Sequence, residues 1–453
     1  MRQANAPLTW RPRPAEAASA PVVVGFSGGL DSTVLLHRLA ADPAMRAHGL
    51  RAVHIDHGLH PDAARWAEHA RMVCAALGID CRTITVAVPR DSGLGPEASA
   101  RRARRVAFAE ALAAGEVLAL AQHRDDQAET FLLRALRASG PDGLAAMRPW
   151  RAFASGWMWR PLLDVPRSAL LAYAEREGLQ WIEDPSNRDE SIDRNWLRHR
   201  VLPLLRKRWP QADVALARAA TLSAEASDLL IEGDDAALTQ ARAGRHDEAL
   251  SRRALSTLAP ERRARVLRRW VETRGLPPLP AEGVARIERD LLPCANDRSP
   301  VFAWHGARIA VWHDALYAFD DAALAGDALP PDWSVEWDGR APLTLPNGDR
   351  LALANADFDT ASLPWSLRVR ARRGGERIRL PGRTHRHALK HLLQDADIPP
   401  WERARMPVID ALDGETLAAG DRIVSAALDA WLRAANAELR WLREDDAAAS
   451  RDA

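Results

Sequence analysis

Cysteine is scarce in this chain: 453 residues contain only Cys74, Cys81 and Cys294. These three form no CxxC pair and no zinc-binding spacing, which argues against zinc, redox and sulfur-relay chemistry and fits a reducing compartment. Lysine is almost missing as well, with only Lys207 and Lys390, so nearly all the positive charge is arginine.

The chain also lacks long hydrophobic runs and a strong net charge. No apolar run approaches the ~18 residues that a membrane-spanning helix needs. Residues 1–20 contain Arg and Pro without an apolar core, so we interpret them as a mobile tail and not a signal peptide. We therefore expect a cytoplasmic protein without membrane contact. Because the net charge is only +1, binding of nucleic acid must depend on local basic patches.

A strand, a glycine loop and a helix follow one another in residues 21–39, PVVVGFSGGLDSTVLLHRL. The apolar residues 22–24 predict a buried strand, and the pattern of residues 34–39 predicts a helix. A loop of this kind directs backbone N–H groups at an anion, and the helix N-terminus adds a partial positive charge. We therefore expect residues 27–32, SGGLDS, to bind phosphate.

The SGGLDS loop has no lysine, whereas a Walker loop, GxxxxGK[ST], places one on the terminal phosphates. Asp31 lies where the helix begins and is a candidate Mg²⁺ ligand, while Ser27 and Ser32 are neutral donors. This set suits holding pyrophosphate as a leaving group better than transferring a γ-phosphoryl group. The alternative is an ordinary strand–turn–helix connection, which we disfavour because strand and helix flank the loop as the motif requires.

Strands and helices continue to alternate after this loop, which predicts a parallel α/β sheet with right-handed crossovers. We predict strands at 51–55, 79–88, 117–121 and 158–162, and helices at 66–77, 97–114 and 127–137. Ligands bind at the carboxyl ends of the strands in such sheets. Three polar segments lie at strand ends, at residues 27–32, 56–58 and 123–129, and we expect them to form one site.

The stretch QHRDDQAET at 122–130 places Asp126 and Glu129 on one helix face, because they are three residues apart. Capping of the first helical turn alone would explain Asp125 or Asp126, and for this stretch in isolation the two readings have about equal weight. Its predicted position beside the SGGLDS loop favours a functional role.

Three segments are basic and each has two readings, a solvated charged face or a phosphate contact. Arg101, Arg104 and Arg105 share one helix face. Residues 195–208 contain six positive or potentially positive side chains and no acid. Residues 368–391 are the most basic, with nine Arg or Lys against the single acid Glu376, and here we favour contact with RNA phosphates.

The alternation of strands and helices ends near residue 210. Residues 213–240 and 261–272 look helical, 301–319 look like strands, and a helix is expected at 388–395 among later strands. We expect an α/β parallel-sheet catalytic domain, Rossmann-like, followed by a mainly helical middle domain and a small α+β C-terminal domain. The predicted boundaries are a mobile tail at 1–20, a catalytic domain at 21–212, a middle domain at 213–330, a C-terminal domain at 331–442 and a tail at 443–453.

These motifs resemble a known family. SGGLDS resembles the pyrophosphate (PP) loop of the N-type ATP pyrophosphatases, and within that superfamily the chain resembles the tRNA(Ile)-lysidine synthetases. The resemblance extends over nearly the whole chain after residue 20. Its motifs are VGFSGGLDS at 24–32, VHIDHGLH at 53–60, EASARRAR at 97–104, QHRDDQAETFLLRALRASG at 122–140, RPLL at 160–163, EDPSN at 183–187, DRN at 193–195 with Arg198, and PVIDALDGETLAAG at 407–420.

The resemblance implies a reaction of ATP and free L-lysine with the wobble cytidine in the CAU anticodon of an isoleucine tRNA, giving lysidine. The chemistry is reasonable, since an amine cannot easily expel oxide from a pyrimidine carbonyl carbon. The base oxygen would attack the α-phosphorus and release pyrophosphate. The ε-amine of lysine would then attack the ring carbon and release AMP, with the base unstacked to reach the site.

The resemblance also implies roles for individual residues. Asp31 would hold Mg²⁺ or phosphate, Asp56 and His57 would lie near the ribose or adenine, and Arg101 and Arg104 would meet the phosphate or the base. The other ATP contacts would be Ser27, Gly28, Gly29, Leu30 and Ser32. The second step would use His123, Asp126 and Glu129, with a carboxylate recognising the lysine ammonium. The tRNA contacts would be Arg198, Arg200, Arg372, Arg373, Arg379 and Lys390.

The chain departs from the family pattern at three positions. Gln122 replaces a frequent His, Arg105 an aromatic residue and Ala138 a Gly. Three alternatives remain. A PP-loop tRNA thiolase would need a cysteine pair or an iron–sulfur site, an amidotransferase-coupled synthetase would need an N-terminal nucleophilic Cys, and a non-catalytic tRNA-binding module would not need SGGLDS. The sequence leaves the oligomeric state open, a homodimer included.

Overall fold

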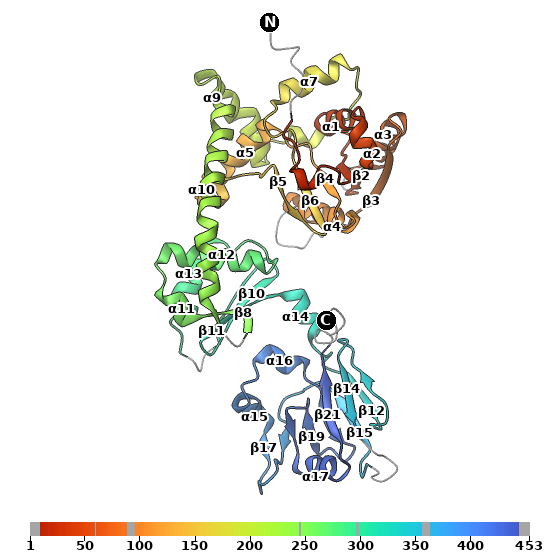
Figure 1. Cartoon of the computed structure of the whole chain (residues 1–453), viewed down its shortest axis with the longest axis vertical. Coiled ribbons are helices and arrows are strands. Elements are labelled where there is room, and N and C mark those ends of the chain that lie inside the picture. Colours follow the sequence, from red (N-terminus) through yellow and green to blue (C-terminus); the bar gives the residue numbers. More distant parts are fainter. Residues whose placement is uncertain are drawn as a thin grey trace. The chain divides into compact units, whose positions relative to one another are not determined.

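The structure is a computed structural model that describes residues 10–58, 60–87, 96–243, 246–295, 299–355 and 363–443. The chain forms two compact units, Met1–Glu232 and Gly233–Ala453, and their division falls within the long helix α10 (Figure 1). Parts of both predicted tails, 1–9 and 444–453, and residues 88–95, between the predicted strand at 79–88 and the predicted helix at 97–114, lie outside the described residues. The predicted division into three domains stays a prediction.

The first unit is built on one six-stranded sheet with the strand order β3-β2-β1-β4-β6-β5. All neighbours are parallel except β5, which pairs antiparallel with β6 at the edge. The predicted parallel α/β sheet is therefore confirmed, with an added edge strand that the sequence reading missed. The strands are β1 Val22–Gly25, β2 Leu50–Asp56, β3 Asp80–Thr85, β4 Val117–Ala119, β5 Trp150–Phe153 and β6 Gly156–Trp159.

The central strand β1 is buried on both faces, as its continuous apolar run predicts. Val22 and Val24 pack into one core cluster and Val23 into another, because successive side chains of a strand point to opposite faces. The helices of this unit are α1 Leu30–Ala40, α2 Pro43–His48, α3 Ala63–Ala76, α4 Pro96–Ala111, α5 Arg124–Ala135, α6 Pro141–Leu144, α7 Arg167–Arg176, α8 Asp193–Trp196, α9 Leu202–Arg208 and α10 Ala212–Ala241. Short helical turns occur at η1 Ala15–Ala17, η2 Pro185–Arg188 and η3 Leu197–Val201.

The expectation of a mobile tail is wrong for residues 10–20. The Trp10 ring lies edge-on to Trp159 with 6.0 Å between centroids, and the Trp159 indole N–H donates to the carbonyl of Arg11 at 3.0 Å. Ala17 in η1 is buried. A buried tryptophan with its indole N–H satisfied gives this segment packing that its Arg and Pro content did not indicate.

The second unit begins with a helical region that also carries a five-stranded antiparallel sheet, β7-β8-β11-β10-β9. The predicted helices at 213–240 and 261–272 and the strands at 301–319 are present, whereas β7 and β8 were not expected. The elements are β7 Arg242–Ala243, β8 His246–Ser251, α11 Arg252–Thr257, α12 Pro260–Thr273, α13 Ala281–Arg286, η4 Ile287–Leu291, β9 Val301–Trp304, β10 Ala307–Trp312, β11 Ala315–Asp320 and α14 Asp321–Asp327.

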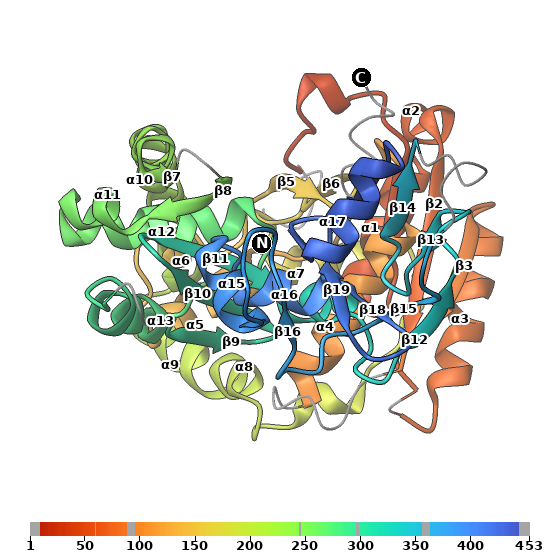
Figure 2. The ribbon, with the colours of Figure 1, turned by 90° about the horizontal axis from the view of Figure 1, so that it is seen from below.

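The end of the chain forms an α+β region with its own hydrophobic core. A five-stranded sheet β12-β15-β18-β19-β20 accompanies a three-stranded sheet β13-β14-β21 and the small hairpin β16-β17. Figure 2 shows strands β12, β15, β18 and β19 of the first of these sheets. Among the described residues, no helix is long and apolar enough to cross a membrane. The elements are β12 Ser334–Trp337, β13 Leu343–Thr344, β14 Arg350–Ala354, β15 Leu367–Arg370, β16 Arg377–Ile378, β17 His387–Ala388, α15 Leu389–Asp395, α16 Pro400–Arg405, β18 Val408–Ala411, β19 Thr416–Ala419, β20 Ile423–Val424, α17 Ala426–Ala434 and β21 Glu438–Leu442.

Candidate active site

The SGGLDS loop connects β1 to the N-terminus of α1, and its serines hold one another. The hydroxyl oxygens of Ser27 and Ser32 lie 3.0 Å apart, and the Ser32 hydroxyl donates to the carbonyl of Gly29 at 3.0 Å. Gly29 caps α1 without a side chain, so no capping side chain competes for the first N–H groups of the helix. The loop therefore has the form of an anion site, with Leu30 and Asp31 in the first turn of α1.

Gly28 is required by its conformation and by its neighbour. Its φ is +80°, and a Cβ built there would lie 3.1 Å from Cδ1 of Ile182. The backbone N–H of Ile182 donates to the Gly28 carbonyl at 2.8 Å. The segment that carries EDPSN therefore helps to hold the loop in place, a contact between distant parts of the chain.

Asp31 faces two other elements of the first unit. Its Oδ2 lies 3.6 Å from Nε2 of His123, and its Oδ1 lies 3.9 Å from Nε of Arg167. Asp31 Oδ1 is buried and accepts no hydrogen bond from the described residues. A carboxylate oxygen in this state has a free lone pair for a cation or for a donor on a ligand.

His123 caps α5 from the carboxyl end of β4. The N–H of Asp126 donates to His123 Nδ1 at 3.4 Å, and the N–H of His123 donates to Asp126 Oδ2 at 3.1 Å. The capping explanation of Asp126 is thus correct, and it does not exclude a site role, since the same residues face Asp31. Burial by itself lowers the pKa of His123, but the carboxylates of Asp126 and Asp31 outweigh it and raise the pKa above its ordinary value.

Glu129 is fully buried and paired with two arginines. Arg198 Nε donates to Glu129 Oε1 at 2.7 Å, and Arg194 Nε donates to Oε2 at 2.8 Å. Arg198 Nη2 also donates to Asp126 Oδ1 at 3.1 Å. These bonds occupy both oxygens of Glu129, so its carboxylate orients the helix that carries Arg194 and Arg198.

Arg198 lies in η3, a π-helical turn between α8 and α9, and such turns often occur at functional sites. We expected Arg198 and Arg200 to contact tRNA. The structure places Arg198 on Asp126 and Glu129, while Arg200 pairs with Glu190 on the exposed surface. A role of these two side chains in tRNA binding stays a prediction.

Arg167 at the start of α7 is a site residue that the sequence reading missed. Its backbone N–H donates to Asp125 Oδ2 at 2.9 Å, and Asp125 Oδ1 accepts from Arg206 at the same distance. The half-exposed guanidinium of Arg167 reaches Asp31 of the lysine-free loop. The sequence feature that could have pointed to Arg167 is the pair Pro166-Arg167, which begins a helical pattern soon after the RPLL motif.

Asp56 and His57 follow β2, near the loop. The Asp56 carboxylate accepts the N–H of Gly58 at 2.8 Å, and His54 Nδ1 lies 2.9 Å from the carbonyl of Phe26, just before the loop. Burial lowers the pKa of His57, and the positive charge of Arg104 lowers it further. Arg104 of α4 therefore lies near His57. Arg101 is exposed on the same helix. The ATP roles of these four residues, Asp56, His57, Arg101 and Arg104, stay predictions.

Two of the three departures from the family pattern, Gln122 and Arg105, make side-chain contacts in the structure. Gln122 Oε1 accepts from Nε of the buried Arg160 at 2.9 Å, and the guanidinium of Arg105 lies 5.8 Å from the centroid of the Phe153 ring. Neither contact reaches Asp31 or the loop.

The residues fit an Mg²⁺ ion bound by one carboxylate together with substrate phosphates. Among the described residues no group of three or more His, Cys, Asp or Glu side chains could form a complete metal site. Mg²⁺ usually binds through one or two carboxylates together with substrate phosphates. The unsatisfied Oδ1 of Asp31, beside the phosphate loop, matches that donor set.

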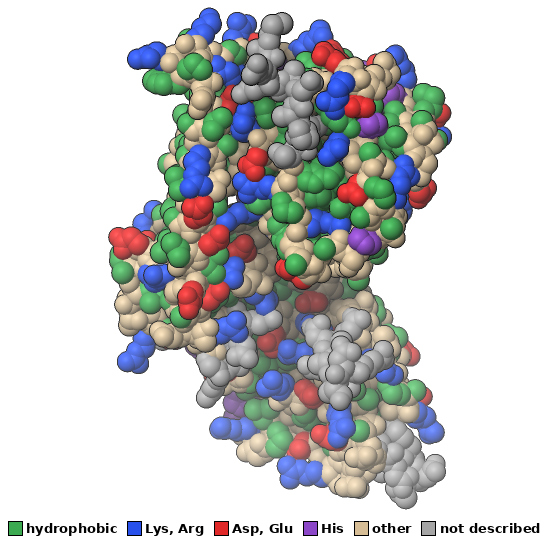
Figure 3. Space-filling view, turned by 45° about the horizontal axis from the view of Figure 1, so that its top comes forward, with side chains coloured by type: hydrophobic (Ala, Val, Ile, Leu, Met, Phe, Trp, Pro, Cys, Tyr) green, Lys and Arg blue, Asp and Glu red, His purple; other side chains and the backbone are tan. Residues whose placement is uncertain are grey.

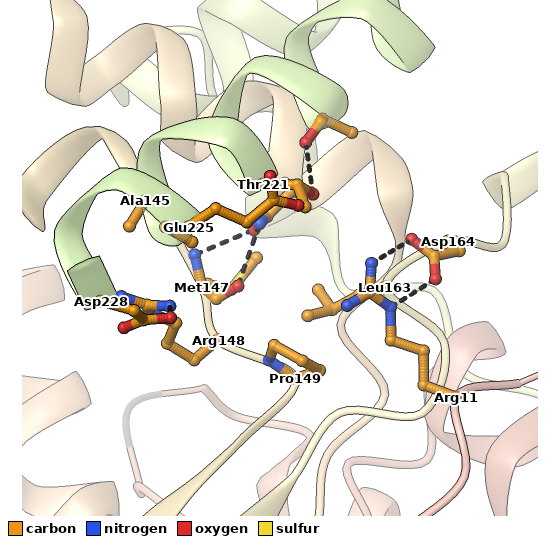
Figure 4. A pocket seen from close by; sticks show the side chains of 13 residues that line it. Arg11, Ala145, Met147, Arg148, Pro149, Leu163, Asp164, Thr221, Glu225 and Asp228 are labelled. Atoms are coloured by element: carbon orange, nitrogen blue, oxygen red, sulfur yellow. Dashed lines mark hydrogen bonds and ion pairs between the residues drawn. The ribbon is translucent and has the colours of Figure 1, made fainter. Parts of the chain in front are cut away.

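A separate cavity of about 260 Å³ lies beside α5 and α10 (Figure 4). Gln127 is one of its lining residues, and its side chain donates to the carbonyl of Met147 and accepts the N–H of Met147, each at 3.0 Å. The cations at its rim are paired, Arg11 with Asp164 and Arg148 with Asp228. The cavity contains none of the predicted site residues.

Two of the cysteines form a pair that the sequence spacing did not reveal. A hydrogen bond with Cys81 and burial raise the pKa of the Cys74 thiol. Cys74 is fully buried on α3, and Cys81 lies on the edge strand β3. The raised pKa makes the Cys74 thiol a poor nucleophile, whereas the same hydrogen bond lowers the pKa of the partly buried Cys81 thiol.

The basic segment 368–391 lies in the second unit. Arg373, Arg379 and Lys390 are exposed there, while Arg372 is partly buried and lies 3.7 Å from Glu376. Figure 3 shows cationic and acidic side chains interspersed over the visible face, as the net charge of +1 suggests. Whether the exposed cations contact tRNA stays a prediction.

Comparison with known proteins places these motifs in a family context. Three family models match the chain: a PP-loop domain at residues 9–205, a TilS substrate binding domain at 250–317 and a TilS substrate C-terminal domain at 367–441. A tRNA(Ile)-lysidine synthase of Xanthomonas axonopodis pv. citri is 54% identical over 440 residues, 97% of this chain and 98% of that protein. Those of Xylella fastidiosa strain Temecula1 and Methylococcus capsulatus are 52% and 38% identical, over 93% and 88% of this chain and 95% and 90% of their own.

Solved structures add weaker likenesses. The U34-tRNA thiolase NcsA from Methanococcus maripaludis matches with a TM-score of 0.37 and 18% identity, over 45% of this chain and 71% of that chain. A crystal structure of a TilS C-terminal domain matches with a TM-score of 0.17 and 32% identity, over 21% of this chain and 84% of that chain.

Proposed function

Because the chain belongs to the tRNA(Ile)-lysidine synthase family, an ATP-dependent group of tRNA-modifying ligases, we propose that it attaches free L-lysine to the wobble cytidine of the CAU anticodon of isoleucine tRNA. The reaction has two steps. ATP first adenylates the base oxygen, and pyrophosphate leaves. The ε-amine of lysine then attacks the ring carbon, and AMP leaves.

The first step would use the SGGLDS loop. Backbone N–H groups at the start of α1, with the hydroxyls of Ser27 and Ser32, would bind the phosphates. Asp31 would hold Mg²⁺, which when bound neutralises charge on the departing pyrophosphate. Asp56, His57, Arg101 and Arg104 would surround the nucleoside.

The second step would use the N-terminal turn of α5. Glu129 is fully buried and both of its oxygens accept from arginines, whereas the side chain of Asp126 is 15% exposed, so Asp126 is the better candidate to bind the lysine ammonium. The amine must lose a proton before it attacks. His123, whose pKa is raised by the surrounding carboxylates, would receive that proton.

One observation carries this assignment: Asp31 of the phosphate loop and His123 at the start of α5 lie 3.6 Å apart. The part of the site that would activate the base and the part that would deliver the amine therefore share one centre. Asp31 Oδ1, which is buried and accepts no hydrogen bond from the described residues, leaves an acceptor in this centre for a bound cation or donor.

The test is incorporation of labelled lysine by the purified protein. Radiolabelled lysine should enter an isoleucine tRNA transcript with a CAU anticodon only when ATP and Mg²⁺ are present, and a transcript with UAU should remain unlabelled. Incorporation of labelled sulfur in place of lysine would support the thiolase alternative. tRNA binding without either label would support the non-catalytic module.

We further propose that the exposed cations of the second unit bind tRNA away from the anticodon and that the protein acts in the cytoplasm. A homodimer would be tested by light scattering with and without tRNA.

A further inference from the structure

A run of exposed cations in the second unit surrounds the hairpin β16-β17. We call residues 372–386 the arginine arm; it contains a turn at 372–376, strand β16 and the connection to β17. Within the described part of the chain, no carboxylate lies at ion-pair distance from Arg373, Arg379 or Arg383, in contrast to Arg386, which lies 3.3 Å from Glu415. Unpaired exposed cations are available to an anionic partner.

The acid within this arm, Glu376, is buried. Its side chain is 3% exposed, and Oε1 accepts the backbone N–H of Arg373 at 2.7 Å and that of Gly374 at 2.9 Å. The backbone carbonyl of Glu376 accepts from Leu389 at 2.8 Å, which ties the turn to the start of α15. One carboxylate thus organises the turn that carries Arg373.

Glu376 is in turn anchored to the central sheet of this region. Arg370, the last residue of β15, donates to Glu376 Oε1 at 3.2 Å and to Asp410 Oδ2 of β18 at 2.6 Å. All three side chains are largely buried. The turn is therefore fixed by side-chain bonds to strands β15 and β18 as well as by its own backbone hydrogen bonds.

The conformation of the turn needs such support. Gly374 and Gly375 have φ values of +86° and +81°, and no atom lies within 4 Å of where their Cβ atoms would be. Glycine keeps more conformational freedom than any other residue, so two in succession would leave Arg373 loosely placed. Burial raises the pKa of Glu376, but the N–H groups of Arg373 and the guanidinium of Arg370 lower it to a net value below the ordinary one, so the carboxylate is charged at neutral pH.

We propose that Glu376 is a positioning residue for tRNA binding: it fixes the 372–376 turn so that Arg373 and the cations of the following hairpin meet successive phosphates of the tRNA backbone. This inference rests on the proposed function, since it takes tRNA as the partner. A cation whose backbone is already fixed loses less conformational entropy when it binds a phosphate. A well-ordered arginine arm therefore binds tRNA more tightly than a flexible one with the same charges.

The test compares Glu376→Gln with the matched control Glu438→Gln, which removes the same charge from an exposed position on β21 of the same region. Binding of full-length isoleucine tRNA is measured from low to moderate salt. For Glu376→Gln we expect a higher Kd, and a salt slope reduced by about one for each phosphate that the arm no longer neutralises. The KM for tRNA should rise, while the KM for ATP and kcat at saturating tRNA stay unchanged. Glu438→Gln should behave as the parent.

Gly374→Ala provides a second route if Glu376→Gln does not fold. It strains the turn at a position with open space and keeps the buried charges, so it should lower the salt slope in the same way. The proposal is overturned if folded variants keep the parent salt slope, or if Glu376→Gln lowers kcat. If Arg373→Gln and Arg379→Gln also keep the parent slope, the proposed tRNA surface itself is wrong, a different outcome from failure of Glu376 alone.

Discussion

Asp31 and His123 lie 3.6 Å apart, although one begins the helix after β1 and the other caps the helix after β4. Strands β1 and β4 are neighbours in the sheet, with Val22 in register with Val117. Their carboxyl ends therefore meet, and the two residues close one centre from two crossovers. This relationship makes Asp31 the first residue to test.

Asp31→Asn should abolish adenylation and leave tRNA binding intact. The amide cannot replace a carboxylate as a Mg²⁺ ligand or as a partner for the loop, and we expect a fall in kcat of about 100-fold or more. Release of pyrophosphate and binding of tRNA are measured on the same preparation. Asp42→Asn, at the partly exposed N-cap of α2, is the control. Equal loss of both properties would identify Asp31 as a structural residue.

Arg167→Gln should weaken the binding of ATP and of pyrophosphate. The loop has no lysine, and Arg167 is the guanidinium that reaches Asp31. Hydrogen bonds to charged groups contribute about 1.5–3 kcal/mol, so affinities should fall about 10- to 100-fold. The dissociation constant of ATP and inhibition by added pyrophosphate measure this effect. Arg176→Gln, at the other end of α7, should change neither, and unchanged pyrophosphate inhibition in Arg167→Gln would exclude a phosphate contact.

Arg198→Met should destabilise the first unit, because Glu129 would retain a buried charge with one partner fewer. Breaking a buried pair in this way costs about 3–5 kcal/mol, whereas an apolar replacement of both partners is often near neutral. Urea unfolding of Arg198→Met and of the double variant with Glu129→Met measures the difference. Arg200→Met, two residues along, loses only an exposed pair and should cost less than about 1 kcal/mol. Equal stability of Arg198→Met and Arg200→Met would contradict the prediction.

The stability contribution of Glu376 should depend on pH in a defined direction. Its pKa is below the ordinary value of 4.5 in the folded protein, so the unfolded chain takes up the proton first as the pH falls. The contribution is present above the ordinary pKa and is lost as the pH falls through the lower folded value. The difference in unfolding free energy between the parent and Glu376→Gln should therefore be constant from neutral pH to about pH 6 and shrink below pH 4.5. If the difference in unfolding free energy instead grows on acidification, the pKa of Glu376 is raised in the folded protein and the prediction is wrong.

Neutralising the arginine arm should change how tRNA binding responds to salt. The double variant Arg373→Gln and Arg379→Gln should lower the salt slope by about two, since each phosphate that is no longer neutralised lowers it by about one. Filter binding over a range of salt concentrations measures the slope. Arg440→Gln, which removes an exposed cation on β21, is the control. An unchanged slope would identify the arm as an ordinary solvated face.

The sequence by itself determined the local elements and the chemistry of the loop. The apolar run before SGGLDS, its glycines and the helical pattern after it identify strand, anion loop and helix, because these properties are set by residues near in sequence. The alternation of such units also predicted that three polar segments would meet at one edge of a parallel sheet. The structure confirms the sheet and brings Asp31 and His123 together.

The tertiary structure decided which charges are paired. Within one basic stretch, Arg198 turns to the buried Glu129, Arg206 to Asp125 and Arg200 to a surface acid. The composition of the stretch cannot distinguish these arginines, because the partner of each depends on which carboxylate, distant in sequence, lies within a few ångströms. The contact of Arg167 with Asp31 and the burial of Glu376 could not be predicted for the same reason. Both arise only where separate segments of the chain pack together.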